Sequence, residues 1–220
     1  MGLSSIIIFG ANSHLSKKIL NDLNFDKIIC ISKNLKIKNK KILIFDEFKK
    51  NEEKISKYIS KNTCTIFFNN LSVDNLILNK SRKELEKELD ASIYSVFENA
   101  KAVARYYIKK GGGSFVFVGS SRGLSSDIGI SGYSISKNAL IGLMNSFAEE
   151  FSHFGVRSNY LSLGYFKSPL FNKIKNKDNL IQKTILKKRG NFKSVVYAIE
   201  FLAKAEYVTK SIIKVDGGYK

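Results

Sequence analysis

SIIIFGANSHLSKKILNDL (residues 5–23) decides the fold, because a continuous apolar run, a polar turn and an amphipathic segment follow one another directly. The run at 5–10 is typical of a strand that is buried on both faces. In 15–23 the apolar positions recur at helical spacing, so a helix with one covered face is expected there. This stretch therefore predicts a strand followed by a helix that packs against it.

The same alternation continues along the chain. Further strands are expected at 27–32, 40–45, 64–68, 114–119, 156–164 and 211–218. Helices are expected at 53–61, at 82–110 (continuous or broken near its start) and at 134–154. Near-continuous apolar strands separated by amphipathic helices indicate a parallel sheet covered on both faces. We therefore predict an α/β fold in which one doubly wound, Rossmann-like, seven-stranded parallel sheet forms a single domain over residues 1–220.

Composition and charge narrow the class of protein. A chain of 220 residues suffices for one large domain, and 44% hydrophobic and 25% charged residues are ordinary for a globular protein. The net charge of +18 comes from lysines spread along the chain. A solvated lysine-rich surface is therefore favoured over nucleic-acid binding, which is kept as a third possibility.

The sequence also indicates where the protein is located, the state of its cysteines and whether it binds a metal. Its apolar runs are too short to span a bilayer and its start does not resemble a secretory signal, so we expect a cytoplasmic protein without membrane contact. Cys30 and Cys64 each lie in a short strand-like run, which favours two buried reduced thiols. No His/Cys cluster suggests a metal site.

YSISK (133–137) carries a tyrosine and a lysine four residues apart. On a helix Tyr133 and Lys137 share one face, so the ammonium lies near the phenol and favours its ionised form. An ordinary amphipathic helix can also begin this way, but Ser120 ends a predicted strand at the sheet edge where this helix begins. Parallel sheets bind ligands at this edge, and we expect the three side chains to meet there.

The turn FGANSHLS (9–16) follows the first strand, at the place where a dinucleotide pyrophosphate meets backbone N–H groups and the positive end of a helix. Only Gly10 remains of a glycine-rich turn. A plain tight turn therefore fits this stretch about as well.

Taken in order, these motifs resemble those of the short-chain dehydrogenase/reductase family, and the resemblance covers nearly all of the chain. The matching segments are LIFDEF (43–48), FFNNLS (67–72, the family's NNAG), VGSSRG (118–123, with the catalytic serine), YSISK (the YxxxK motif), RSNYLSLG (157–164, the RVNxVxPG segment) and IIKVDGG (212–218). The resemblance implies hydride transfer between a nicotinamide and a carbonyl or alcohol.

The resemblance also implies catalytic roles. Tyr133 would protonate the carbonyl oxygen, or act as the base in the reverse direction. Lys137 would lower the pKa of Tyr133 and hold the nicotinamide ribose, while Ser120 would hydrogen-bond the substrate oxygen. The family's fourth catalytic position, an asparagine that holds a water molecule, falls on Ser92.

The cofactor-binding residues that the resemblance implies lie on several loops. They are Gly10, Ala11, Asn12, Ser13, His14 and Leu15 at the first turn, Asp46 at the adenine, Asn69 and Leu71 beside the adenosine ribose, and Leu163, Gly164 and Ser168 at the nicotinamide. After the second strand, Ser32 and Lys33 suit a 2′-phosphate, and no acid is present there to bind a ribose 2′-hydroxyl. We expect NADP, with NAD as the alternative, although Lys33 also fits as one more surface lysine.

The phosphate-binding turn departs from the family pattern. His14 and Ser16 replace the second and third glycines, so the pyrophosphate path must shift around a Cβ. Either side chain would also suit hydrogen bonding to a phosphate.

Residues 165–193 form a short basic lobe, with eight lysines and one arginine against one aspartate. This excess suggests an anionic substrate, such as a nucleotide-linked sugar or a phosphopantetheine-borne acyl group; a solvated lysine-rich lid is the alternative. The leading function is thus an NADP-dependent carbonyl reductase acting on a small molecule. The alternative is a non-catalytic dinucleotide-binding or scaffold module.

Two amphipathic segments, 92–108 and 139–151, carry more apolar positions than one sheet face covers. The family's members usually pair through these helices, so the resemblance implies a homodimer or homotetramer. Core packing alone is the alternative use of the same residues.

Overall fold

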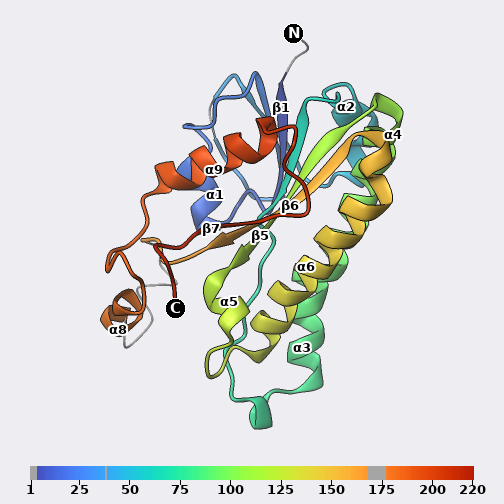
Figure 1. Ribbon diagram of the computed structural model, residues 1–220. Coiled ribbons are helices and arrows are strands. Elements are labelled where there is room, and N and C mark those ends of the chain that lie inside the picture. Colours follow the sequence, from blue (N-terminus) through green and yellow to red (C-terminus); the bar gives the residue numbers. More distant parts are fainter. Residues whose placement is uncertain (1–3, 38, 168–176) are drawn as a thin grey trace.

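The centre of the protein is a fully parallel seven-stranded sheet, seen in a computed structural model that describes residues 4–37, 39–167 and 177–220 (Figure 1). The strands are β1 (Ser5–Phe9), β2 (Lys27–Ile31), β3 (Ile42–Phe45), β4 (Thr63–Phe67), β5 (Gly113–Ser120), β6 (Val156–Leu163) and β7 (Ile212–Val215). Their order across the sheet is β3-β2-β1-β4-β5-β6-β7. The predicted doubly wound α/β fold is confirmed, and the order reverses at β1, next to β4.

Helices cover both faces of the sheet (Figure 1). On one face lie α1 (His14–Ile19) and α9 (Phe192–Lys204). On the other lie α2 (Glu52–Ser56), α4 (Ser95–Lys110) and α6 (Ser131–Phe151), and α3 (Arg82–Leu89) packs against α6. Shorter helices and helical turns are η1 (Lys49–Asn51), η2 (Ile77–Asn79), η3 (Asp90–Tyr94), α5 (Ser121–Ser125), η4 (Ser152–Phe154) and α8 (Lys177–Gln182).

The alternation of side chains along β1 shows why the sheet has two covered faces. Ile6 and Ile8 belong to the core cluster under α1 and α9, whereas Ile7 and Phe9 belong to the cluster under α4 and α6. All four are buried. Successive side chains of this strand point to opposite faces, and both faces are covered, so all four of these side chains are apolar. This explains the continuous apolar run at 5–10.

The helices differ from the prediction in three places. α1 ends at Ile19 instead of residue 23, and the helix expected at 53–61 is the short α2. The helix expected at 82–110, continuous or broken near its start, is interrupted there by a π-helical turn, η3, in agreement with the second of these alternatives. Helix α9 was not predicted, although its sequence is amphipathic and Asn191 caps its first turn by accepting a hydrogen bond from the Lys193 N–H.

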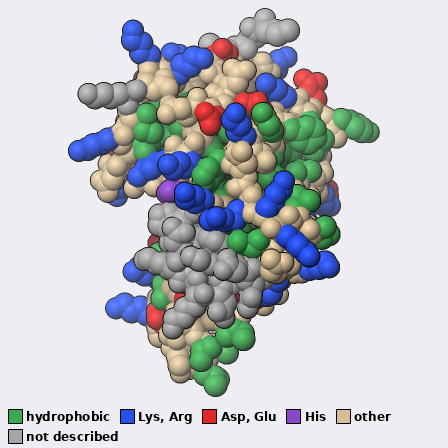
Figure 2. All heavy atoms as spheres, turned by 90° about the vertical axis from the view of Figure 1, so that its left-hand side faces the viewer, with side chains coloured by type: hydrophobic (Ala, Val, Ile, Leu, Met, Phe, Trp, Pro, Cys, Tyr) green, Lys and Arg blue, Asp and Glu red, His purple; other side chains and the backbone are tan. Residues whose placement is uncertain are grey.

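Three sequence expectations concern the whole molecule. Cys30 and Cys64 are free and buried, as predicted, and burial raises the pKa of each thiol to about 12. Within the described residues no helix has the length and apolarity to cross a membrane, and no group of His, Cys, Asp and Glu is arranged to hold a metal. On the face with α1 and α9, basic side chains are scattered among hydrophobic and uncharged ones (Figure 2). Cytoplasmic location and the lack of a nucleic-acid partner stay predictions.

Candidate active site

The predicted catalytic side chains share one cavity at the carboxyl edge of the sheet. Its volume is about 320 Å³, and it lies where β1, β4, β5 and β6 end and where α1 and α6 begin. The residues expected at the site that line it are Ser13, His14, Leu15, Ser120, Tyr133, Lys137, Leu163 and Gly164. Loops from both ends of the sequence therefore contribute to a single crevice at the switch point of the sheet.

Ser120 and Tyr133 are adjacent in this crevice. Ser120 is the last residue of β5 and caps α5 by accepting a hydrogen bond from the Gly123 N–H at 3.3 Å. Tyr133 lies in the first turn of α6 and is hydrogen-bonded to Ser120. A Cβ at Gly123 would lie 2.9 Å from both the Tyr133 ring and the Lys137 side chain. Glycine at this position therefore lets both side chains approach the strand end.

The pKa of Tyr133 is raised. Burial raises it above the ordinary value of 10.0; the hydrogen bond with Ser120 and the positive charge of Arg122 lower it, and Asp74 raises it further. The Lys137 ammonium lies 5.5 Å from the centre of the Tyr133 ring. In this structure the loss of water around the phenol outweighs the nearby positive charges, so the net shift is upward, and the expected role of Lys137 stays a prediction.

Lys137 is a buried lysine whose ammonium has no carboxylate partner among the described residues. Its side chain donates hydrogen bonds to the carbonyl oxygens of Asn69 and Val118, at 3.4 and 3.3 Å. Burial lowers the pKa of Lys137 from 10.5 to about 8. An unpaired buried charge is costly, and such groups are concentrated at functional sites.

The turn after β1 requires glycine at its first position. Gly10 has φ +69°, and a Cβ there would lie 2.8 Å from the backbone nitrogen of Asn69. Ser13 caps α1, accepting a hydrogen bond from a first-turn N–H at 3.1 Å. His14 is exposed, and its ring centre lies 6.3 Å from that of Phe192, so the imidazole borders the crevice without filling it.

The residues expected at the adenosine end do not line this cavity. Ser32 and Lys33 follow β2, and Asp46 follows β3. Lys33 forms an ion pair with Glu47 at 3.1 Å, and Asp46 accepts a hydrogen bond from the Asn51 side chain at 2.7 Å. The two charged groups predicted to contact the cofactor thus already have protein partners. Of the first-turn residues outside the lining, Ala11 is buried and Asn12 is exposed.

Ser92 lies in the π-helical turn η3 and does not line the cavity. Its side chain is buried, and its hydroxyl accepts a hydrogen bond from the Leu71 N–H at 3.2 Å. Single π-helical turns are frequent at functional sites. In this structure the turn holds the segment after β4, whose Asn69 carbonyl in turn accepts the hydrogen bond from Lys137.

The segment after β6 supplies part of the wall. Gly164 lines the cavity, while Ser168 lies outside the described residues. The sequence analysis missed Phe166 and Phe192, which line the cavity with ring centres 5.9 Å apart. Both lie within the basic lobe at 165–193, whose lysine-rich composition gave no signal for an aromatic wall.

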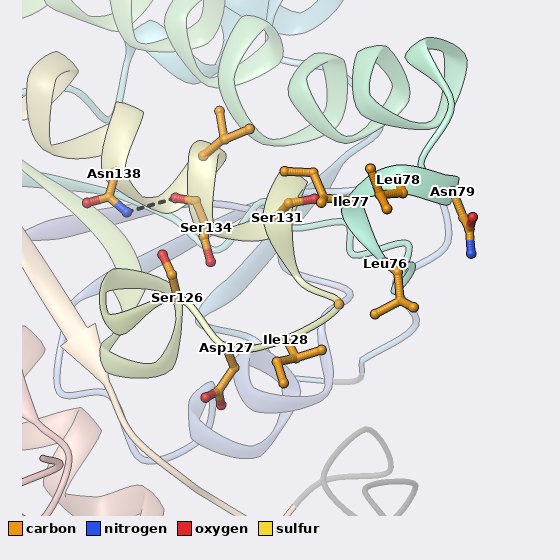
Figure 3. Close-up of a pocket in the computed structure, with 12 residues that line it drawn as sticks. Leu76, Ile77, Leu78, Asn79, Ser126, Asp127, Ile128, Ser131, Ser134 and Asn138 are labelled. Atoms are coloured by element: carbon orange, nitrogen blue, oxygen red, sulfur yellow. Dashed lines mark hydrogen bonds between the residues drawn. The ribbon is translucent and has the colours of Figure 1, made fainter.

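A larger groove of about 820 Å³ runs along a different face of α6 (Figure 3). Its wall includes the exposed apolar residues Leu76, Ile77, Leu78, Ile128 and Ile135. The predicted site residues that the structure describes do not line it. The smaller cavity at Tyr133 is therefore the candidate active site.

A doubly wound parallel sheet with a cavity at its switch point is the architecture of a Rossmann-type protein, and here a tyrosine, a buried lysine and a serine line that cavity. Comparison with known proteins agrees. The family model described as enoyl-(acyl carrier protein) reductase matches residues 50–220. The chain is 36% identical over 165 residues to the 3-oxoacyl-(acyl-carrier-protein) reductase FabG of Buchnera aphidicola subsp. Schizaphis graminum, covering 72% of this chain and 67% of that protein.

Solved structures show the same fold. A short-chain dehydrogenase of Leptospira borgpetersenii with bound NAD+ aligns with a TM-score of 0.84 at 20% identity, covering 99% of this chain and 93% of the other. A gluconate 5-dehydrogenase of Burkholderia cenocepacia in complex with NADP and tartrate aligns with a TM-score of 0.85 at 17% identity, covering 97% and 94%. The chain belongs to the short-chain dehydrogenase/reductase family. It is thus an NAD(P)-dependent oxidoreductase.

Proposed function

We propose that this enzyme uses NADPH to reduce a carbonyl group on an anionic substrate, and that the substrate is an acyl thioester borne on phosphopantetheine. The observation that carries the proposal is the single cavity shared by Ser120, Tyr133 and Lys137. The 36% identity to a 3-oxoacyl-(acyl-carrier-protein) reductase supports the choice of substrate.

In this mechanism Tyr133 gives its phenolic proton to the substrate's carbonyl oxygen. Its raised pKa keeps the phenol protonated at neutral pH, so it is ready to act as the acid. Ser120, hydrogen-bonded to Tyr133, orients the same oxygen. The nicotinamide, when bound, supplies the hydride. Lys137, with its pKa lowered to about 8, lies where a proton can pass to the phenol after each turnover.

Residues along the crevice fit a dinucleotide. At the nicotinamide end, Gly164 and Lys137 line the wall. At the pyrophosphate end, Ser13 and His14 border the start of α1. Asn69 does not line the cavity, but its carbonyl accepts the hydrogen bond from Lys137, and its side-chain oxygen is buried without a hydrogen-bond partner among the described residues. A ribose hydroxyl near Asn69, which the resemblance leads us to expect, is therefore part of the proposal.

The preference for NADP is assigned to a cluster at the ends of β2 and β3. Lys33 and Lys50 both contact Glu47 at 3.1 Å, and the nearby Asp46 balances the remaining charge. Lys33 is exposed, so it is the cation of this cluster that we propose for a 2′-phosphate. Lys33→Met is expected to weaken NADPH binding about tenfold, as for the loss of one charge-assisted contact, and to leave NADH binding unchanged. Fluorescence titration measures both. Lys36→Met, which removes a nearby exposed lysine, is the control.

The basic lobe is proposed to bind the phosphopantetheine-bearing carrier of the acyl thioester. Lys187 and Lys188 are exposed in the described part of the lobe, and Lys109 and Lys110 are exposed at the end of α4. Reversing the first pair to glutamate should raise KM for a carrier-borne acetoacetyl group and leave KM for a small neutral acetoacetyl thioester unchanged. Reversing the second pair is the matched control. Faster reduction of neutral carbonyls than of every phosphate-bearing one would contradict the proposed substrate class.

We also propose that the enzyme is a homodimer or homotetramer. Tyr94 and Phe97, at and after η3, and Ile135 on α6 are exposed apolar side chains. Ile135 also borders the large groove, so the apolar surface continues from α6 into it. Light scattering should show more than one chain per particle for the wild type. Phe97→Lys together with Ile135→Lys should shift the particle to a single chain.

A direct assay tests the proposed reaction. NADPH oxidation with acetoacetyl coenzyme A, followed at 340 nm, should be saturable in both compounds. Failure to bind NADPH at millimolar concentration would contradict the proposal at its first step.

A further inference from the structure

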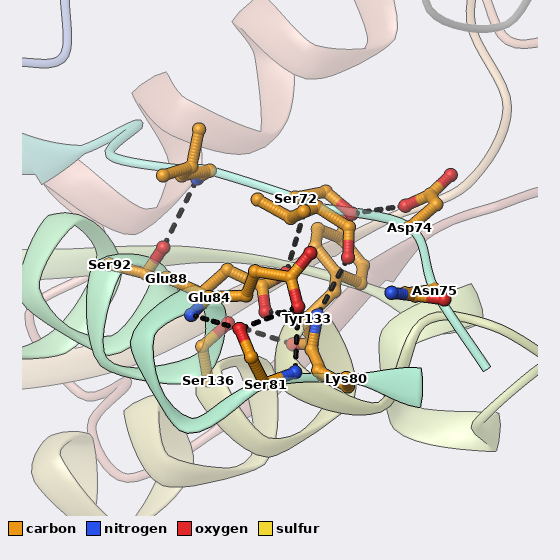
Figure 4. Close-up of polar contacts among 12 residues, drawn as sticks. Ser72, Asp74, Asn75, Lys80, Ser81, Glu84, Glu88, Ser92, Tyr133 and Ser136 are labelled. Atoms are coloured by element: carbon orange, nitrogen blue, oxygen red, sulfur yellow. Dashed lines mark hydrogen bonds and ion pairs between the residues drawn. The ribbon is translucent and has the colours of Figure 1, made fainter. Parts of the chain in front are cut away.

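A buried ion pair joins the segment after β4 to helix α3 (Figure 4). Lys80 Nζ lies 2.7 Å from Glu88 Oε2, and the two side chains are only 5% and 1% exposed. Lys80 also donates a hydrogen bond to the Val73 carbonyl oxygen at 2.7 Å, and the Val73 N–H donates to Glu88 Oε1 at 2.8 Å. The charges thus compensate each other, and the backbone supplies further hydrogen bonds.

The segment 71–81, here called the strap, is bonded on two sides. On the α3 side, the ion pair is followed one helical turn later by Ser92, which accepts a hydrogen bond from the strap at 3.2 Å. On the α6 side, the Asn75 N–H donates to the Gly129 carbonyl oxygen at 2.9 Å. The strap therefore connects α3 to the chain just before Tyr133.

The same ion pair packs against the first turn of α6. A Cβ at Gly132 would overlap the Glu88 carboxylate and would lie 2.9 Å from Lys80 Cε. Tyr133 is the next residue, and its ring lines the catalytic cavity. The place of this ring consequently depends on how closely α6 approaches the ion pair.

A buried ion pair is weak evidence for stability, because apolar residues of similar volume often replace such pairs without loss. Its hydrogen bonds are directional, however, and fix one arrangement of the groups they join. We infer that Lys80 and Glu88 are positioning residues, which hold the strap and the first turn of α6 so that Tyr133 lies beside Ser120. The inference rests on the proposed catalytic role of Tyr133.

The test replaces the pair by Lys80→Met with Glu88→Leu. Folding should be retained, since two apolar side chains fill the same space. With acetoacetyl coenzyme A as the probe, kcat should fall by about tenfold or more while KM for NADPH stays within about twofold, because a small displacement of an acid–base group slows the chemical step. Amide hydrogen exchange over 129–136 should accelerate about tenfold with no change in the sheet.

The matched control is Arg82→Met with Glu86→Leu, which removes an exposed ion pair of the same 2.7 Å separation from the same helix. It should leave kcat and hydrogen exchange unchanged. Glu88→Gln is the second variant, to be used if the apolar pair does not fold, and it should change both quantities in the same direction. Unchanged kcat and exchange in a folded variant, or exchange that accelerates equally in the sheet, would overturn the inference. If the wild type oxidises no NADPH with the probe, the proposed function fails, and the exchange over 129–136 alone decides the positioning role.

Discussion

Two buried lysines lie next to the start of helix α6, and their surroundings differ. Lys80 faces the Glu88 carboxylate, and its charge is compensated inside the protein. Lys137 contacts the carbonyl oxygens of Asn69 and Val118 and the ring of Tyr133, with no carboxylate partner in the described part of the chain. A carboxylate thus compensates the charge of Lys80. The charge of Lys137 has no such compensation among the residues that the structure describes, and it lies next to Tyr133 at the cavity.

The difference distinguishes a lysine that fixes the geometry of the site from a lysine that can take part in proton transfer. A compensated pair fixes geometry and has little reason to change its protonation state. An uncompensated buried ammonium has its pKa lowered to about 8, close enough to neutrality for proton transfer. Substitution of Lys137 or Tyr133 should therefore alter the reaction most, whereas substitution of Lys80 or its partner should act through the placement of α6.

The largest effect is expected for Tyr133→Phe. The change removes the phenolic oxygen and leaves the ring, so kcat should fall by about 10³-fold, within the range contributed by acid–base groups. Stopped-flow measurement of NADPH oxidation gives kcat, and NADPH quenching should show unchanged binding. A variant that keeps more than a tenth of the activity would show that the proton comes from another group.

Lys137→Met should lower kcat by about 10²-fold and, unusually, stabilise the fold. Below about pH 8 the ammonium is charged in both the folded and unfolded chain, so the full cost of burying it is present. Between about pH 8 and 10.5 the folded chain loses the proton first, and the free energy of unfolding of the wild type rises with pH. The variant should therefore gain up to about 3 kcal/mol at pH 7, since each pKa unit corresponds to about 1.4 kcal/mol.

Urea unfolding of both proteins at pH 7 and pH 10 measures this gain, which should shrink at the higher pH. The same substitution at exposed Lys101 is the control and should leave stability within about 0.5 kcal/mol at both values. A gain that does not depend on pH would show that folding does not lower the pKa of Lys137.

Most of the fold and the centre of the site could be predicted from the sequence. β1 and β2 are continuous apolar runs because both faces of the sheet are covered at its centre, so they were visible without any partner. The edge strand β7 is only partly buried. Ser120, Tyr133 and Lys137 were placed together by topology alone, since the strand end and the helix start share one edge. The tight turn after β1 was also located correctly, with Gly10 at a positive φ, whereas its binding of a phosphate stays a prediction.

What the sequence could not give depends on contacts between distant residues. Lys80 and Glu88 are ordinary surface residues by type, and only the folded strap shows that they bury each other. The raised pKa of Tyr133 likewise depends on how much water the surrounding loops exclude. Phe166 and Phe192 are far apart in sequence and become part of one wall only when α9 packs beside β6.

Gly132→Ala tests the Lys80 side with a single methyl group. The new Cβ would collide with the Glu88 carboxylate, so the variant should lose about 2 kcal/mol of unfolding free energy, as for an overpacked core. Gly142→Ala is a matched control in the same helix, because a Cβ there meets nothing within 4 Å. It should stabilise by about 0.5–1 kcal/mol, as expected for alanine in a helix interior. Equal effects at the two glycines would show that α6 does not rest on the ion pair.

Ser92→Ala should have the smallest effect and decides between two roles for this residue. As an anchor of the strap, Ser92 only accepts the hydrogen bond from the Leu71 N–H, and Leu71 is half-buried, so water can replace the lost oxygen. Stability should then fall by about 1 kcal/mol, and kcat should fall by less than about tenfold. As the holder of a water that relays protons, which the family resemblance implies, Ser92 would instead contribute about 10² or more to kcat. Because the Ser92 hydroxyl faces the strap and lies outside the cavity lining, we expect the smaller effect. A hundredfold loss of kcat at unchanged stability would show instead that Ser92 takes part in the reaction.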